Sequence, residues 1–303
     1  MIKKAVKFLR TLQALSVKVD SIQQALGRIE SRQLTEIDDI SRSEFKVYSQ
    51  SGEDGIIQFL VNHVQIANPR FIEFGVENYL EANTRFLTLN NYWSGLVIDG
   101  DPSNIEFIKN DPIYWRCPIT AVNSFITKEN INHLIKSNGF DGEIGILSVD
   151  IDGNDYWIWE SIDCVNPAIV IAEYNSFFGP NANVTIPYKG DFVRTSEHFS
   201  WIYYGASITA LTKLADKKGY ALVATNYGGN NVFFVRKDLV GNLKSLTAKE
   251  AYRRTNYREV HDREGKLSFL PFELAQDVIS DVNIFDLDDH TEKKLKEILN
   301  KNL

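Results

Sequence analysis

The first thirty residues carry apolar side chains at alternating spacings of four and three residues. This repeat predicts a helix with one apolar stripe, as in a coiled coil. An amphipathic helix that folds back on its own chain is the alternative. A strict seven-residue repeat is what a supercoiled partner requires, so we expect residues 5–30 to drive self-association into a homo-oligomer. The heptad stripe comprises Phe8, Leu12, Leu15, Val19, Ile22, Leu26 and Ile29.

From residue 70 onward the pattern changes to short apolar runs separated by helical segments. Five runs rich in Val and Ile, with centres roughly 25 residues apart, predict parallel strands joined by crossover helices. Two later runs with only a four-residue turn between them predict an antiparallel hairpin. The runs are 71–75, 95–99, 119–122, 144–150, 168–173, 220–226 and 231–238.

These elements predict an α/β fold: a doubly wound, Rossmann-like, seven-stranded sheet that ends in an antiparallel hairpin and is preceded by an N-terminal helix. We expect three parts: residues 1–40 as the heptad helix and a polar linker, 41–240 as the sheet domain, and 241–303 as a charged extension of helix and loop. A long insertion, residues 175–203, follows the fifth strand. Its aromatic side chains either stack on a sugar or pack the insertion against the sheet.

Composition narrows the function classes. The chain has 33 Lys and Arg against 40 Asp and Glu, a net charge of −7, which disfavours nucleic acid as a partner. No stretch approaches the length of apolar sequence that spans a membrane, and charges interrupt the N-terminus too often for a signal peptide. We therefore expect a cytoplasmic protein. Cys117 and Cys164 are too few for a disulfide framework and are expected in the core.

Ligands of open α/β sheets bind beyond the carboxyl ends of the strands, so the residues that end each strand are the candidates. Strand one ends in Glu73 and Gly75, and this lone glycine falls short of the three that cradle a pyrophosphate. Strand two ends in Asp99, where an acid typically accepts the hydroxyls of a ribose. Asp101, which precedes Pro102, is predicted to cap the next helix.

Carboxylates also follow strands four and five. Asp150 and Asp152 come directly after strand four, and Glu173 and Asn175 follow strand five. Oxygen ligands at two adjacent strand ends suit a hard divalent cation such as Mg²⁺, and the expected ligands are Asp150, Glu173 and Asn175. Asp155 is predicted instead to cap the helix that follows.

Together these segments resemble the FkbM-like branch of class I S-adenosylmethionine (SAM)-dependent methyltransferases. The resemblance covers about residues 45–236, and the chain departs from the family in the single glycine of the first turn and in the insertion. The matching segments are SQSGEDG (49–55), EFGVE (73–77), IDGDP (98–102), SVDIDGNDYW (148–157) and IAEYN (171–175).

The resemblance implies that residues 41–240 form a SAM-dependent methyltransferase domain with the insertion as substrate lid. It implies transfer of a methyl group to a hydroxyl of a sugar or surface-polysaccharide glycan. Related metal-dependent sugar O-methyltransferases carry acidic metal ligands where this chain has Asp150, Glu173 and Asn175. The residues implied in SAM binding are Gln50, Ser51, Glu73, Gly75, Asp99, Asn123 and Ser124.

Methyl transfer from a sulfonium is an in-line displacement that needs positioning and a deprotonated acceptor. A metal lowers the pKa of a bound hydroxyl, and Asp150, Asp152 or His198 is the candidate proton acceptor.

Two other functions are alternatives to methyl transfer. A NAD-dependent or nucleotide-sugar oxidoreductase is disfavoured by the missing glycines and by the hairpin. A non-catalytic SAM-binding scaffold is suggested by the heptad stripe and opposed by the acids at the strand ends.

Overall fold

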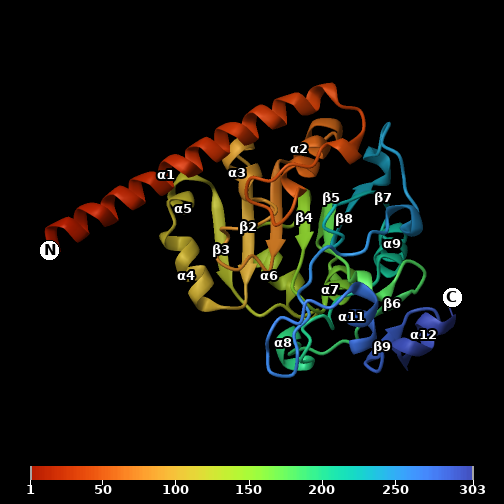
Figure 1. Ribbon diagram of the computed structural model, residues 1–303. Coiled ribbons are helices and arrows are strands. Elements are labelled where there is room, and N and C mark those ends of the chain that lie inside the picture. Colours follow the sequence, from red (N-terminus) through yellow and green to blue (C-terminus); the bar gives the residue numbers. More distant parts are fainter. Residues whose placement is uncertain (1, 302–303) are drawn as a thin grey trace.

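The computed structural model describes residues 2–301, and a seven-stranded sheet lies at its centre (Figure 1). The strand order is β3-β2-β1-β4-β5-β8-β7, and β8 alone runs antiparallel to its neighbours. The predicted α/β fold with a terminal hairpin is confirmed. The strands are β1 (Arg70–Phe74), β2 (Ser94–Asp99), β3 (Ile119–Asn123), β4 (Gly142–Val149), β5 (Val165–Glu173), β7 (Tyr220–Thr225) and β8 (Asn231–Arg236).

Helices cover both faces of this sheet. One face packs against α6, α7 and α9, and the other packs against α2, α3, α4 and α5. Successive strand residues alternate between the two cores: Ile72 and Phe74 face the first, and Phe71 faces the second. The helices are α2 (Glu53–His63), α3 (Arg85–Asn91), α4 (Pro102–Asn110), α5 (Pro112–Arg116), α6 (Ile131–Ser137), α7 (Asp155–Ser161) and α9 (Ile208–Lys217).

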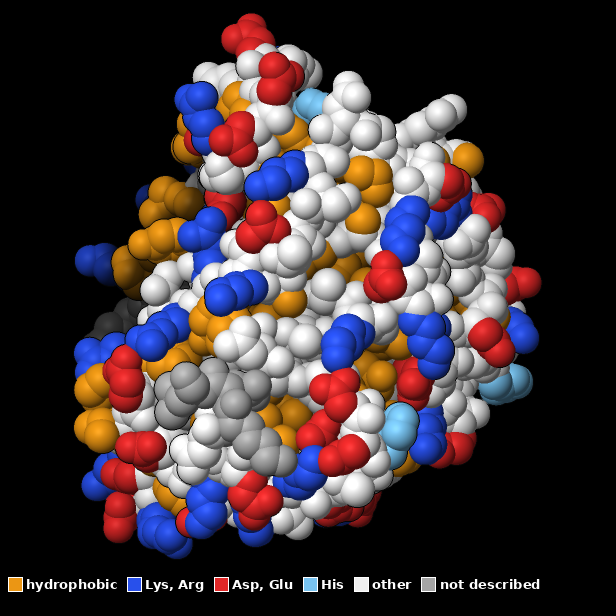
Figure 2. All heavy atoms as spheres, turned by 90° about the vertical axis from the view of Figure 1, so that its right-hand side faces the viewer, with side chains coloured by type: hydrophobic (Ala, Val, Ile, Leu, Met, Phe, Trp, Pro, Cys, Tyr) orange, Lys and Arg blue, Asp and Glu red, His pale blue; other side chains and the backbone are white. Residues whose placement is uncertain are grey.

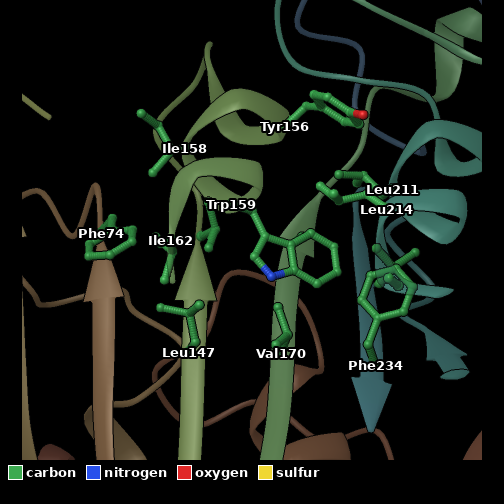
Figure 3. Close-up of a cluster of buried hydrophobic side chains, with 14 of the residues drawn as sticks. Phe74, Leu147, Tyr156, Ile158, Trp159, Ile162, Val170, Leu211, Leu214 and Phe234 are labelled. Atoms are coloured by element: carbon green, nitrogen blue, oxygen red, sulfur yellow. The ribbon is translucent and has the colours of Figure 1, made fainter. Parts of the chain in front are cut away.

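The reversed strand β8 lies inside the sheet, between β5 and β7, and not at its edge. Figure 3 shows how the core holds it there: Trp159 of α7 extends over Val170 of β5 toward Phe234 of β8. The rings of Trp159 and Phe234 are 5.2 Å apart, and both side chains are almost fully buried. An interior position explains why the β8 run is apolar at nearly every residue, since both of its faces are covered.

The N-terminal helix α1 (Ile2–Gln33) contacts the rest of the chain through a mostly polar face near its C-terminal end. Gln24 donates to the hydroxyl of Tyr48 at 2.9 Å. Gly27 approaches the body so closely that a Cβ there would lie 2.5 Å from Val47. This end of the helix therefore does fold back on the body, but the contact does not use the heptad stripe.

The heptad stripe itself faces outward. Ile22 is 60% exposed and Ile29 is 51% exposed, although both lie in the part of α1 that contacts the body. Figure 1 shows α1 crossing the top of the molecule and extending past α5 at its N-terminal end. The stripe thus remains an apolar surface within the described chain, because the tertiary contacts of α1 are made by a different face.

The insertion and the C-terminal extension fold together. Strand β6 (Val184–Thr185) of the insertion pairs with β9 (Asn283–Asp286), which pairs with β10 (Thr291–Lys294). The prediction of only helix and loop for residues 241–303 is therefore wrong. Phe178 and Phe192 are buried against apolar residues of the extension. The short helices are α8 (Arg194–Glu197), α10 (Ala248–Ala251), α11 (Phe272–Val278) and α12 (Leu295–Lys301), and the 3₁₀ turns are Leu34–Glu36, Ile40–Arg42, Ser176–Phe178 and Lys237–Leu239.

Charges of both signs are interspersed over the face that carries the β7 edge and the C-terminal extension (Figure 2). No strong field of one sign is expected on that face, because opposite charges lie next to one another. Among the described helices, none combines the length and the apolar character needed to cross a bilayer.

Candidate functional site

Two adjoining cavities lie at the carboxyl edge of the sheet, where ligands of such folds bind. The larger, of about 400 Å³, lies at the ends of β1, β4 and β5, and we call it the acidic cavity. The smaller, of about 180 Å³, lies at the ends of β2 and β3, and we call it the β2 cavity. Gly75, Glu77 and Asp152 line both. The carboxylates that line the acidic cavity are Glu73, Glu77, Glu81, Asp150, Asp152, Glu173 and Glu259.

Gly75 lines both cavities. Its φ is +66°, and its N–H donates to the carbonyl of Ile98 in β2 at 3.0 Å. A Cβ at this position would lie 1.9 Å from the carbonyl oxygen of Asp150. Glycine is therefore required for two reasons, a left-handed backbone and a close approach between the ends of β1 and β4.

Asp99 closes β2 with its carboxylate held in place by its neighbours. It accepts hydrogen bonds from the backbone N–H groups of Glu77 and Asp101, both at 2.8 Å, and from the side chain of Asn104 at 3.0 Å. A carboxylate offers about four acceptor positions, so one remains for a ligand in the β2 cavity, which Asp99 lines. Asp101 caps α4 by accepting from Ser103 at 2.8 Å, as predicted.

The two residues predicted after β3 are placed differently. Ser124 lines the β2 cavity together with Phe125 and Ile126. Asn123 is exposed and is not part of the lining described for either cavity, and its side-chain amide donates to the carbonyl of Asp99 at 3.0 Å. Asn123 thus supports the β2 turn, whereas Ser124 is available to a ligand.

Glu73 is buried at the end of β1 and lines the acidic cavity. Its carboxylate accepts hydrogen bonds from the backbone N–H groups of Asn83 at 2.8 Å and Thr84 at 3.1 Å. Burial raises the pKa of Glu73 to about 7, although the hydrogen bonds from Thr84 and Asn83 oppose this shift. Glu73 therefore shapes the loop at residues 83–84 as well as the cavity wall.

Three carboxylates converge in the acidic cavity. Asp150, Asp152 and Glu173 can each bring one oxygen within 4.8 Å of the others. Burial raises the pKa of Asp150 well above its ordinary value, and Asp152 and Asp155 raise it further. Burial and the charges of Asp150 and Asp152 likewise raise the pKa of Glu173. One oxygen of Glu173 is buried without a hydrogen-bond partner. The cluster is thus short of positive charge.

Arg194, from α8 in the insertion, is the only basic residue among those described as lining the acidic cavity. It forms ion pairs with Asp152 and, at 2.6 Å, with Glu259, and its guanidinium lies 4.4 Å from the centre of the Tyr204 ring. Burial lowers the pKa of Arg194, but the charges around it outweigh burial and raise the pKa overall. Its positive charge is therefore already engaged within the protein.

Gln50 lines the acidic cavity, and its side-chain oxygen accepts a hydrogen bond from Asn230 at 3.1 Å. Ser51 is outside the described lining, and its N–H donates to Glu53 at 2.8 Å. The structure therefore places Gln50, but not Ser51, where it can touch a ligand in the cavity.

Asn175 has a structural role in place of the predicted metal coordination. Its amide donates to the carbonyls of Ile202 and Tyr204 at 2.9 and 3.0 Å, and its oxygen accepts from Phe177 at 3.0 Å. These bonds hold the two ends of the insertion together. Asn175 is also outside the described lining of both cavities, whereas Asp150, Asp152 and Glu173 line the acidic cavity.

His198 is not among the residues described as lining either cavity. Its ring contacts Phe199, with 4.5 Å between ring centres, and shares a 2.7 Å hydrogen bond with Ser200. Burial lowers the pKa of His198, and Arg263 adds to this effect. The placement gives His198 no contact with the acidic cluster, so the candidate proton acceptors are Asp150 and Asp152.

Several lining residues gave no signal in the sequence. Arg194 lies in the insertion and Tyr204 directly follows it. Tyr257 and Glu259 lie in the extension, about 110 residues beyond Asp150 in the chain. Their positions depend on how the insertion and extension pack.

Scans against protein-family models and against curated proteins find no match. Solved structures with a similar fold include the N-terminal domain of EvdMO1 with SAH bound, a SAM-dependent methyltransferase from Clostridium acetobutylicum and an O-methyltransferase family protein from Burkholderia thailandensis.

The identities of these three are 12%, 11% and 11%, and the TM-scores are 0.41, 0.39 and 0.36. The alignments cover 69%, 60% and 72% of this chain and 95%, 88% and 71% of the others. Other similar structures include carbon methyltransferases. At such low TM-scores these likenesses carry no argument about the site, and the FkbM-like branch stays a prediction.

We expect Gly75→Ala to destabilise the protein more than Gly139→Ala. Both glycines have positive φ, +66° and +71°, but a Cβ at Gly139 would meet nothing within 4 Å. The shared backbone strain costs about 1 to 2 kcal/mol. The overlap with Asp150 should add roughly 1 to 3 kcal/mol at Gly75 only. Urea unfolding of both variants measures the difference, and equal losses would contradict the close approach of β1 and β4.

Proposed function

We propose that the protein is a SAM-dependent O-methyltransferase that transfers a methyl group to a hydroxyl of a sugar or glycan. The observation that carries this proposal is the pairing of the two cavities across Gly75. The β2 cavity offers apolar walls and Asp99, which suit an adenine and a ribose. The acidic cavity offers carboxylates, which suit the positive sulfonium and ammonium groups of SAM. The motif resemblance supports the same cofactor.

The polarity of the site disfavours a dinucleotide. A pyrophosphate needs backbone N–H groups and glycines near the first turn, but here Glu77 and Asp152 line both cavities beside Gly75. Negative charges at that point repel phosphate.

A SAM-binding scaffold without activity would share the cavities, and it would be recognised by SAM binding without turnover.

Methyl transfer needs an acceptor oxygen in line with the sulfonium and a group that takes its proton. Asp150 and Asp152 lie in the acidic cavity next to Gly75, where the methionine part of SAM would lie. We assign proton removal to one of these two carboxylates. The insertion, which brings Arg194 to the cavity, serves as the substrate lid.

A divalent metal fits part of this donor set. Asp150, Asp152 and Glu173 supply oxygen ligands of the kind Mg²⁺ prefers, and the unpartnered oxygen of Glu173 is available to a cation. When bound, the metal would lower the pKa of the acceptor hydroxyl. Arg194 pairs with Asp152 at the same place, so it competes with the metal for that ligand.

The first test is SAM binding. Calorimetry should detect SAM and S-adenosylhomocysteine binding, and Asp99→Asn should weaken it by about 1.5 to 3 kcal/mol because a charge-assisted hydrogen bond to the ribose is lost. Asp101→Asn is the matched control, since Asn caps a helix as well as Asp and this residue is outside the described cavity linings. Unchanged affinity in Asp99→Asn would remove Asp99 from the site.

The second test concerns the metal. Mn²⁺ binding, followed by electron paramagnetic resonance of the full chain, should weaken at least about tenfold in Glu173→Gln, because one charged ligand is lost. Asp141→Asn, an exposed position just before β4, should leave it unchanged. Full methyltransferase activity after exhaustive EDTA treatment would contradict metal assistance and leave a simple general base.

We also propose that the chain forms homo-oligomers through the heptad stripe. Leu15 and Ile22 are 55% and 60% exposed, and the contacts of α1 with its own body use a different face. Burying an exposed apolar stripe against a second copy removes it from water, which favours association.

Light scattering tests this interface in the full chain. Wild type should be larger than a monomer, and Leu15→Glu with Ile22→Glu should convert it to monomer, because charges within the stripe oppose burial. Arg28→Glu is the control, since Arg28 is exposed and outside the stripe. If the double variant keeps the oligomeric state of wild type, the stripe does not drive assembly.

A further inference from the structure

The part of the acidic cavity over β5 and β8 lies away from the β2 cavity in the strand order. It is lined by Glu173, Asn231 and Asn230, and the extension adds Tyr257 and Glu259. Glu173 and Asn231 are direct partners in the β5–β8 pairing. If SAM occupies the side toward β1 and β2, the side over β5 and β8 is left for the acceptor. The polar groups that line this second side then indicate which chemical groups the acceptor carries.

Asn231 presents an unused hydrogen-bond acceptor. Its side chain is almost fully buried, with 3% of the residue exposed. The amide nitrogen donates to Glu53 at 3.3 Å, which fixes the orientation of the group. The amide oxygen is then left without a partner, and a buried oxygen of this kind is costly unless a ligand donates to it. A ligand group that donates a hydrogen bond, such as a hydroxyl or an ammonium, would therefore satisfy the amide oxygen of Asn231.

The hydroxyl of Tyr257 is a second unused group in this wall. Its oxygen is buried and has no partner at full hydrogen-bond geometry, although the side chain of Ser51 lies close by. Burial raises the pKa of Tyr257, although Ser51 lies near enough to oppose the shift, so the hydroxyl stays protonated at neutral pH. A protonated phenol both donates and accepts, and it matches another hydroxyl well.

The charge of the cavity disfavours one class of acceptor. Its lining has seven carboxyl groups, of which Glu73, Asp150 and Glu173 have raised pKa values. Its lone cation, Arg194, is already paired with Asp152 and Glu259. No described cation of the lining is left to neutralise a carboxylate or phosphate on the acceptor. In the metal-free protein, an anionic group on the acceptor side of this cavity would be repelled and would lose its hydration without a counter-charge.

We propose that the acceptor is a polyhydroxy compound that is uncharged or carries an amine, and that its hydroxyls bind Asn231 and Tyr257. Uronic acids, sugar phosphates and nucleotide sugars are expected to bind the metal-free site more weakly than such compounds. The inference rests on the proposed methyltransferase function, because it assigns the remaining half of the same cavity.

The test uses the full chain loaded with S-adenosylhomocysteine and three probes of similar shape: methyl glucoside, methyl glucosaminide and methyl glucuronide. Saturation-transfer NMR titrations give their affinities. The neutral and amine-bearing probes should bind, and the glucuronide should bind at least tenfold more weakly than either. Equal or tighter binding of the glucuronide would overturn the inference, and so would the absence of binding by all three probes.

Tyr257→Phe removes only the hydroxyl. It should lower the affinity for methyl glucoside severalfold and leave the affinity for S-adenosylhomocysteine unchanged. Tyr227→Phe is the control, because Tyr227 is 68% exposed in the turn before β8 and is outside the described cavity linings. Unchanged glucoside binding in Tyr257→Phe would remove Tyr257 from the acceptor wall. Failure of wild type to bind S-adenosylhomocysteine would instead refute the proposed function itself, so calorimetry separates the two failures.

Discussion

The close approach of two strand ends sets the geometry of the whole site. Gly75 turns sharply after β1 in a left-handed conformation, and its Cα lies against the carbonyl of Asp150 at the end of β4. Only a residue without a side chain allows this contact. It places the acids after β4 beside the turn after β1, and it divides the carboxyl edge into two cavities that share Gly75, Glu77 and Asp152.

The acids gathered there are unusual because they are not matched by nearby cations. Each buried carboxylate disfavours the charge of the others, which is why burial and mutual repulsion raise the pKa values of Asp150 and Glu173 together. Arg194 relieves part of this repulsion through Asp152. A site with this electrostatic imbalance favours positively charged or hydrogen-donating ligands, whatever the detailed chemistry.

The second half of the site depends on segments outside the parallel strands. The insertion and the extension share an apolar core and a small antiparallel sheet, and together they bring Arg194, Tyr204, Tyr257 and Glu259 to the cavity. The buried aromatic side chains Phe178 and Phe192 serve that core. Of the two roles considered for the aromatics of the insertion, Phe178 has the packing role, whereas Phe192 packs in this core and also lines the β2 cavity.

Local patterns in the sequence were enough to predict the sheet and the residues that end its strands. Strand burial follows from the period and composition of each apolar run, and the cap at Asp101 depends on residues next to it in the chain. Asp99, Gly75 and Asp150 could be placed at one edge because parallel strands bring their carboxyl ends together.

Tertiary packing decided which residues line the site and which way the heptad stripe faces. Asn175 and Asp152 both lie near strand ends, yet of these two only Asp152 is in the described lining of the acidic cavity. Asn175 is engaged by carbonyls of Ile202 and Tyr204 across the insertion. The direction of the heptad stripe depended on which face of α1 meets the body, and Gly27 permits that contact on another face. Tyr257 and Glu259 reach the cavity only through the packing of the extension. Contacts between residues so far apart in the chain are set by how whole segments pack, and no local pattern records them.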